Sequence, residues 1–302
     1  MFDVYRATPR FSPLVIAAFY RDDLKGILLA VVQKEHEGLL GTLSARSIIW
    51  GGPLTDSGEV TSELLRHYNE TVRGKAVYTQ VRNFHPLRPE QRKPYEANGF
   101  TYEEHLNILV DLTVGMEEFW RGIKSNRRRG INKAKGRGFG FDVATDARYL
   151  EIFYRLLGKT YRQIRLPIPD EAFFAALQDN LAGSLRWFAL TKDGEPVIVM
   201  VALLDGKLLR PFYIGGPEDP RLLQERPTDL FHFEVMRWAI ANGFAVYDWM
   251  GAGKPGKDYG VRDFKMQYGG ELVETGRFMK IHKPLVMAMS KLGFWFWRRI
   301  QG

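Results

Sequence analysis

The chain has 302 residues, of which 45% are hydrophobic, 13% aromatic and 26% charged. This length predicts about two domains, and the aromatic content indicates folded cores rather than disorder. Because the chain contains no cysteine, disulfides, thiolate zinc sites, iron–sulfur clusters and a cysteine nucleophile are excluded. The six histidines are scattered without a metal-binding spacing, so we expect no metal site.

The first residues have neither the basic charges nor the long apolar run of a signal peptide. No run of about 18 apolar residues, the length that spans a bilayer, occurs in the sequence. We therefore expect a cytoplasmic protein, and the lack of cysteine fits a reducing compartment.

The formal net charge is +8, and one segment carries the whole excess. Residues 121–137 contain eight basic residues and no acidic residue, while the rest of the chain is neutral. Apolar residues recur there at helical spacing, so we expect a helix that Gly136 and Gly138 end. The segment is either a solvated basic surface or the binding site of an anionic partner such as RNA, a nucleotide pyrophosphate or a lipid head group.

The two halves of the chain share an order of predicted elements. The first half predicts a hairpin of residues 15–20 and 27–32, a strand at 48–50, a helix at 63–72, a strand from 76 and a strand at 107–112. The second half predicts a hairpin of residues 187–190 and 197–204, a strand at 208–214, a helix at 229–242 capped by Thr228, a strand from 245 and a strand at 272–278. Gly-Gly-Pro follows the third strand in both halves, at 51–53 and 215–217. The pattern predicts two copies of one α+β unit, each with a mostly antiparallel sheet.

Several of these segments are similar to a known family. Residues 95–100 look like the end of a GNAT N-acyltransferase domain, and the whole chain resembles the FemABX-like branch, in which two GNAT-like domains stand in tandem. The resemblance is carried by Gly51-Gly52-Pro53, Val110-Asp111-Leu112, the junction 126–134, the signature 259–265 and Tyr268-Gly269-Gly270. It implies GNAT-like domains at 1–136 and 137–278, with mixed, mostly antiparallel sheets and a tail, 279–302, that packs back on the first domain. No heptad run is present, so we expect no coiled-coil arm.

The resemblance also implies an activity. Enzymes of this branch move an aminoacyl group from aminoacyl-tRNA to an amine of a peptidoglycan precursor, a muropeptide linked to a nucleotide or a lipid. Acetyl-CoA-using GNAT enzymes carry a Gly-rich phosphate motif before their long helix, and neither 56–61 nor 224–229 fits it. Pro227 would also remove a backbone N–H from that cradle. We therefore expect no cofactor and a tRNA-borne donor.

Two alternatives remain open from the sequence. One is an acyl-CoA-dependent N-acyltransferase that acts on a small-molecule or sugar amine. The other is a non-catalytic protein that keeps the scaffold and binds RNA or a membrane surface. The C-terminal Phe294-Trp295-Phe296-Trp297 either packs on the first domain or makes peripheral contact with the inner face of a membrane.

By resemblance, Phe264 and Lys265 lie at the acyl-transfer site. A fixed cation there would stabilise the oxyanion of the tetrahedral intermediate, an effect of about 3–4 kcal/mol for one donor. Asp111 is either an acceptor contact or a helix cap, and Tyr213 is either near the acceptor or in the core. Tyr259 and Arg262, in the same signature, are expected to hold a phosphate or a sugar.

The residues expected to meet tRNA phosphates are Lys124, Arg127, Arg128, Arg129 and Lys133. Residues 251–258 also scan as GxxxxGK, but Asp258 stands where an ATP-binding P-loop needs Ser or Thr. We expect that loop to frame the acceptor cleft instead.

Overall fold

The computed structural model describes residues 1–163 and 166–289, and the chain forms two compact units. The first unit comprises Phe2–His105 and the chain from Glu274 on, and the second comprises Leu106–Val273. Each is an α+β unit built on one mixed sheet, of six strands in the first and seven in the second. The α+β prediction is thus confirmed. The division falls at 105 and 273, whereas the sequence suggested 136 and 278.

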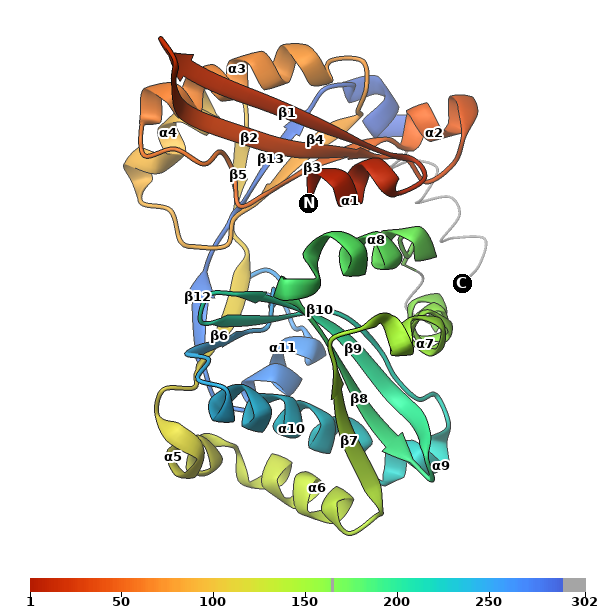
Figure 1. The fold of residues 1–302 in the computed structure, drawn as a ribbon. Coiled ribbons are helices and arrows are strands. Elements are labelled where there is room, and N and C mark those ends of the chain that lie inside the picture. The colour runs from red at the N-terminus through yellow and green to blue at the C-terminus, as the bar shows by residue number, and fades with distance from the viewer. Residues whose placement is uncertain (164–165, 290–302) are drawn as a thin grey trace. The chain divides into compact units, whose positions relative to one another are not determined.

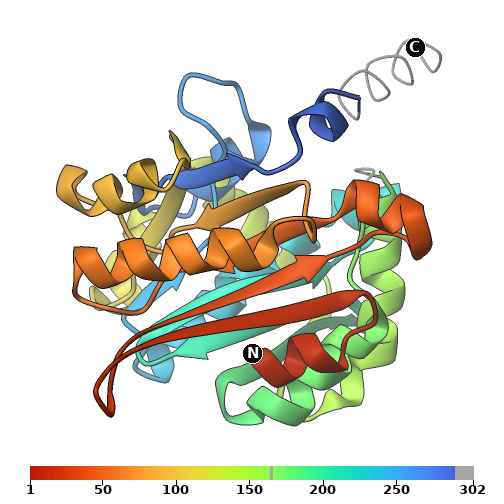
Figure 2. The same cartoon turned by 90° about the horizontal axis from the view of Figure 1, so that it is seen from above.

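The first unit begins with a short helix and a long antiparallel hairpin. Its helices are α1 (Phe2–Ala7), α2 (Gly38–Ser44), α3 (Gly58–Val72) and α4 (Pro89–Ala97). Its strands are β1 (Phe11–Tyr20), β2 (Asp23–Gln33), β3 (Arg46–Trp50), β4 (Tyr78–Arg82), β5 (Thr101–Glu103) and β13 (Arg277–Ile281), in the sheet order β1-β2-β3-β4-β13-β5. Helix α3 runs alongside β1 and β2 (Figure 2). It begins earlier than predicted because Ser57 caps it by accepting a hydrogen bond from the Val60 amide.

The second unit repeats this order and adds elements at its start. Its helices are α5 (Gly115–Gly122), α6 (Ser125–Lys135), α7 (Leu150–Gln163), α8 (Glu171–Leu181), α9 (Pro220–Gln224), α10 (Pro227–Ala241) and α11 (Gly260–Met266), with 3-10 turns η1 (Ala147–Tyr149) and η2 (Ala182–Ser184). Its strands are β6 (Leu106–Asp111), β7 (Phe139–Ala144), β8 (Leu185–Lys192), β9 (Glu195–Asp205), β10 (Leu208–Gly215), β11 (Val246–Asp248) and β12 (Glu271–Glu274), in the sheet order β12-β6-β11-β10-β9-β8-β7.

The two sheets exchange one strand. Strands β1 to β4 of the first sheet correspond in order and direction to β8 to β11 of the second. Strand β13, from the end of the chain, lies between β4 and β5, while β6, from the first half, lies between β11 and β12 (Figure 1). The expected single strand at 272–278 is therefore wrong, because the chain leaves one sheet after β12 and enters the other with β13.

The basic segment also differs from its prediction, because it forms the end of α5 and then α6 rather than one helix. Gly130 lies in the middle of α6, where a glycine normally weakens a helix. A Cβ at this position would stand 2.1 Å from Oδ2 of Asp229 on α10. The glycine thus allows α6 and α10 to pack closely.

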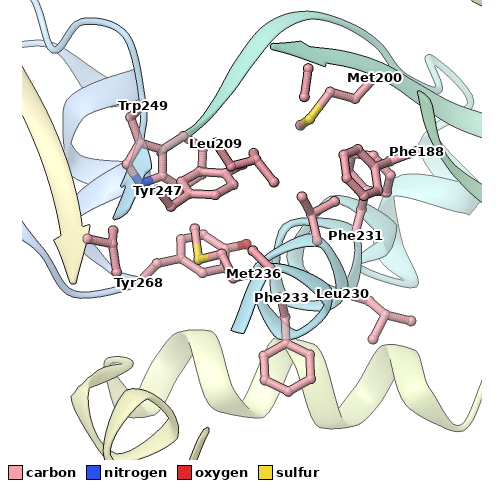
Figure 3. Close-up of a cluster of buried hydrophobic side chains, with 14 of the residues drawn as sticks. Phe188, Met200, Leu209, Leu230, Phe231, Phe233, Met236, Tyr247, Trp249 and Tyr268 are labelled. Atoms are coloured by element: carbon pink, nitrogen blue, oxygen red, sulfur yellow. The ribbon is translucent and has the colours of Figure 1, made fainter. Parts of the chain in front are cut away.

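Each unit has its own apolar core. In the second unit, α10 packs against the sheet, and Figure 3 shows its Phe231 near Phe188 of strand β8. Helix α10 has ten buried residues, so buried side chains lie around most of its circumference. No helix in the described ranges is long and apolar enough to cross a membrane. Residues 294–297, which were considered for membrane contact, lie outside these ranges.

Phe278 tests the importance of the exchanged strand. Its ring is fully buried and stacks on Tyr95, with centroids 4.1 Å apart. We expect Phe278→Ala to lower the free energy of opening of β4 and β5 by about 3–5 kcal/mol, the usual cost of deleting a buried aromatic ring. Native-state hydrogen exchange of β4 measures this.

Ile281→Ala, in the same strand but at a side chain that is 41% exposed, is the matched control. It should change the opening free energy by less than about 1 kcal/mol. Equal effects of the two substitutions would contradict the role given to the β13 core contact.

Candidate active site

Strands β10 and β11 diverge in the second sheet. They are parallel but pair at only two positions, Leu208 with Val246 and Leu209 with Tyr247, although β10 continues to Gly215. The corresponding strands of the first unit, β3 and β4, pair at five positions along their full length. In the second sheet, β10 and β11 therefore separate beyond the end of β11, whereas β3 and β4 of the first sheet stay paired.

Lys265 lies at this point. Its ammonium nitrogen on α11 donates hydrogen bonds to the carbonyl oxygens of Trp249, at 2.9 Å, and Gly251, at 2.5 Å, just after β11. Burial lowers the pKa of Lys265 to about 8, while the Asp248 carboxylate acts in the opposite direction. A lysine with such a pKa is mostly charged at neutral pH and can also exchange a proton there.

A cluster of aromatic rings lies next to the Lys265 side chain. Phe264 lies 5.8 Å from His232 and 5.6 Å from Tyr268, between ring centroids, and Trp249 lies 4.7 Å from His232. Figure 3 shows Trp249 beside Tyr247 and, below them, Tyr268. Burial lowers the pKa of His232 to about 3, and the positive charges of Lys265 and Arg127 add to this shift. His232 is therefore a neutral imidazole at physiological pH.

Arg127 has a different role from the one predicted. It is only 6% exposed, forms an ion pair with Asp229 of α10 and donates to Oε1 of Gln267 at 3.0 Å. Its guanidinium also lies 4.2 Å from the centre of the Phe264 ring. Arg127 does not belong to the exposed basic surface, because it joins α6 to α10 and to the end of α11. The sequence pattern treated it like its neighbours, since its burial depends on Asp229, about a hundred residues away.

Two of the remaining basic residues of α6, Arg129 and Lys133, lie near the start of α10. A cavity of about 310 Å³ lies there, lined by Asn126, Arg127, Arg129, Gly130, Lys133, Arg226, Asp229 and Gln267. Arg129 and Lys133 are exposed, and Arg226 is the residue before α10, with φ of +64°. Lys124 is exposed at the start of α6, and Arg128 is half-buried. A cavity with several cations at a helix N-terminus favours an anion. Sequence reasoning missed Arg226, although it precedes Pro227 at the predicted helix start.

Asp111 lies at the opposite end of β11 from the carbonyls that bind Lys265. Asp111 pairs with Val246 at the far end of β11 and accepts hydrogen bonds from the amide and hydroxyl of Thr113, which lower its pKa. It lines a separate cavity of about 400 Å³ together with Tyr268 and Gly270. Its hydrogen bonds are those of a cap for the following turn.

Three further residues were expected to contact substrate. Tyr213 packs against Phe174 of α8, with ring centroids 5.1 Å apart. Tyr259 is 41% exposed at the start of α11. Arg262 donates to carbonyls of the 251–258 loop, including that of Lys254 at 3.0 Å, and so holds that loop. Contact of these three residues with substrate remains a prediction. In the parts of the chain described, no group of three metal-binding side chains is present.

Residues 121–266 match the family described as "Acetyltransferase (GNAT) domain". The match spans most of the second unit and includes Phe264 and Lys265. A comparison with curated proteins gives no match.

The chain is also similar to solved structures. A crystal structure of FemX gives a TM-score of 0.69 at 14% identity, over 95% of this chain and 92% of that chain. L-PGS from Bacillus licheniformis gives 0.59 at 15% identity, over 98% and 92%. A tandem GNAT protein from the clavulanic acid biosynthesis pathway gives 0.60 at 10% identity, over 91% and 85%. The fold is therefore the FemX-like tandem GNAT fold that the sequence predicted.

The Arg127–Asp229 pair yields a prediction for stability. Arg127→Met should cost about 3–5 kcal/mol at pH 7, because it leaves the buried Asp229 carboxylate without its partner. Burial raises the pKa of Asp229, and the guanidinium opposes this shift, so the pKa should rise further in the variant. A raised carboxyl pKa penalises the folded state only where the carboxyl is ionised, so the cost should shrink as the pH falls from 7 to 5.

Urea unfolding followed by tryptophan fluorescence at both pH values measures this cost. Arg129→Met, in the same helix but exposed, is the control and should change stability by less than about 0.5 kcal/mol. A cost that does not depend on pH would contradict the assignment to Asp229.

Proposed function

We propose that this protein is an N-acyltransferase that moves an aminoacyl group from aminoacyl-tRNA to an amine of a peptidoglycan precursor. The observation that carries the proposal is the part-buried ammonium of Lys265, held by two carbonyls where β10 and β11 diverge. An ammonium has three donors, and two are used by Trp249 and Gly251. The third is the donor that we assign to the substrate carbonyl oxygen.

In the proposed reaction, the acceptor amine attacks the carbonyl carbon of the aminoacyl ester. A C–N bond forms, the carbonyl oxygen gains negative charge, and Lys265 stabilises that charge. The intermediate then expels the ribose oxygen of the tRNA as the C–O bond breaks. The proton lost by the amine passes to this leaving oxygen, so that an amide and a free hydroxyl result. Phe264 shapes the wall of the site beside Lys265.

The cavity at the start of α10 supports a donor rich in phosphate. Arg129, Lys133 and Arg226 bring three positive charges to this cavity, and its one acidic residue, Asp229, is paired with Arg127. A tRNA end would place backbone phosphates against these cations. The peptidoglycan acceptor rests on the resemblance of residues 259–270 to the FemABX-like signature and on the likeness to FemX.

Acyl-CoA is the second candidate donor, because a cationic cavity at a helix N-terminus also suits a pyrophosphate. Against it stands Pro227, the first residue of α10, which offers no backbone N–H to a phosphate.

Lys265→Ala tests the catalytic assignment. We expect turnover of aminoacyl transfer to fall at least tenfold with little change in folding, because one oxyanion donor is worth about 3–4 kcal/mol. In the parent protein, turnover should decline as the pH rises through about 8, since the donor loses its proton. Steady-state kinetics across pH measures both effects.

Lys280→Ala is a matched control, because Lys280 also donates to a carbonyl, that of Asn98, but lies in the first unit. Turnover of this control should be preserved. Full activity of Lys265→Ala would remove Lys265 from the mechanism.

Binding measurements across a salt series distinguish the donors. We expect purified protein to bind total charged tRNA in a salt-sensitive manner and not to bind acetyl-CoA. Replacement of Arg129, Lys133 and Arg226 by alanine should reduce the slope of log K against log salt by about 2 to 3, one phosphate contact per cation.

The control replaces Arg73, Lys75 and Lys93, three exposed bases of the first unit, by alanine. It removes the same charge and should leave the slope nearly unchanged. If acetyl-CoA binds saturably, and alanine replacement of Arg129, Lys133 and Arg226 abolishes this binding, the donor is acyl-CoA instead.

A further inference from the structure

The Trp249 and Gly251 carbonyls that hold Lys265 belong to a tight turn after β11. Met250 has φ of +54° and Gly251 has φ of +119°, so both lie in the region that L-residues rarely adopt. A methionine in this conformation costs of the order of 1–3 kcal/mol and persists only where neighbouring contacts enforce it. The residues that enforce this turn therefore also fix the carbonyls around Lys265.

Strand β6 supplies most of these contacts. Its backbone carbonyls accept hydrogen bonds from the Trp249 amide, at 3.0 Å, and the Ala252 amide, at 2.7 Å. Between them, Oδ1 of Asn107 accepts a hydrogen bond from the Gly251 amide at 2.8 Å. Asn107 thus binds the centre of the turn, between the two carbonyls that Lys265 contacts.

Asp248 and Arg210 hold Asn107 in place. The amide nitrogen of Asn107 donates to Oδ1 of Asp248 at 2.7 Å, and the same oxygen accepts from the Met250 amide at 2.9 Å. The other oxygen of Asp248 accepts from Nε of Arg210 at 3.0 Å. Asn107, Asp248 and Arg210 are all buried, so their hydrogen bonds have a fixed geometry in a medium of low dielectric.

We infer that Asn107 is a positioning residue for Lys265, acting through the 249–251 turn. Asn107 orients the Gly251 peptide, the turn presents the Trp249 and Gly251 carbonyls, and these carbonyls aim the ammonium. The inference rests on the proposed function of Lys265, but its geometry is independent of which donor or acceptor the enzyme uses.

Three other charged or titratable groups lie near Lys265. Asp248 on β11 is a carboxylate, His232 on α10 is neutral, and Arg127 on α6 lies behind the Phe264 ring. None of them binds the Gly251 amide, so loss of Asn107 should leave the Gly251 peptide without its side-chain acceptor and free to reorient. The ammonium would then reach water, and its pKa would rise toward the ordinary value of 10.5.

The experiment measures the pKa of Lys265 without substrate. The full-length protein is labelled briefly with acetic anhydride between pH 6 and 11, and modification of Lys265 is quantified by peptide mass spectrometry. We expect a midpoint near 8 in the parent protein and a midpoint higher by at least about one pH unit in Asn107→Ala.

Asn83→Ala is the matched control. Asn83 is also buried and also holds a turn, through the carbonyls of Thr275 and Gly276, but it lies in the first unit. Its substitution should leave the midpoint of Lys265 unchanged. An unchanged or lowered midpoint in Asn107→Ala overturns the inference.

A second measurement needs no variant and covers the case in which Asn107→Ala does not fold. In the parent protein, the Met250 and Gly251 amides should exchange with deuterium as slowly as the amides of β11, because side chains accept both. Rapid exchange of both amides would contradict the inference. Since neither measurement uses turnover, failure of this inference is distinct from failure of the catalytic role tested by Lys265→Ala.

Discussion

Strand β13 is hydrogen-bonded to β4 and β5, and β6 takes the corresponding place between β11 and β12 in the other sheet. Because each sheet is completed by a strand from the opposite half of the chain, neither half has a closed hydrogen-bond ladder by itself. Without the exchanged strand, which is the second from one edge in each sheet, the two strands that flank it would each have a row of backbone donors and acceptors unpaired. This pairing requirement decides where the units begin and end.

The same exchange brings a polar residue to the proposed site of the second unit. Strand β6 brings Asn107 to the turn after β11, and this turn carries the carbonyls that contact Lys265. On the other side of the site, Arg127 connects α6 to α10 and stacks on Phe264. Two residues from the first half of the chain, both buried and both polar, therefore hold the Phe264-Lys265 pair in place. Buried polar groups of this kind specify one arrangement because any other leaves them without partners.

Local signals in the sequence predicted much of this architecture. The hairpin at β1 and β2, the helices α3 and α10 and the two Gly-Gly-Pro turns follow from alternation, helical spacing and turn residues. The repeated order of these elements predicted the tandem α+β units, and the signature around Phe264-Lys265 led to the site. The strand exchange could not be predicted, because the pattern of apolar and polar residues within β6 and β13 does not specify which of the two sheets each strand joins. The burial of Arg127 and the role of Asn107 depend on Asp229 and Gly251, far along the chain, and left no local pattern.

The order of strands along the chain also constrains the time course of folding. The partners of β13 in the first unit are complete after residue 105, but β13 itself begins at residue 277. During synthesis, the position between β4 and β5 in the first sheet must therefore stay vacant while the whole second unit emerges from the ribosome. Such long-range pairing slows folding and leaves strand edges exposed to other chains until it is made. The second unit has no such delay, since β6 precedes its remaining strands, and so the later unit in the sequence is the first that can close its sheet.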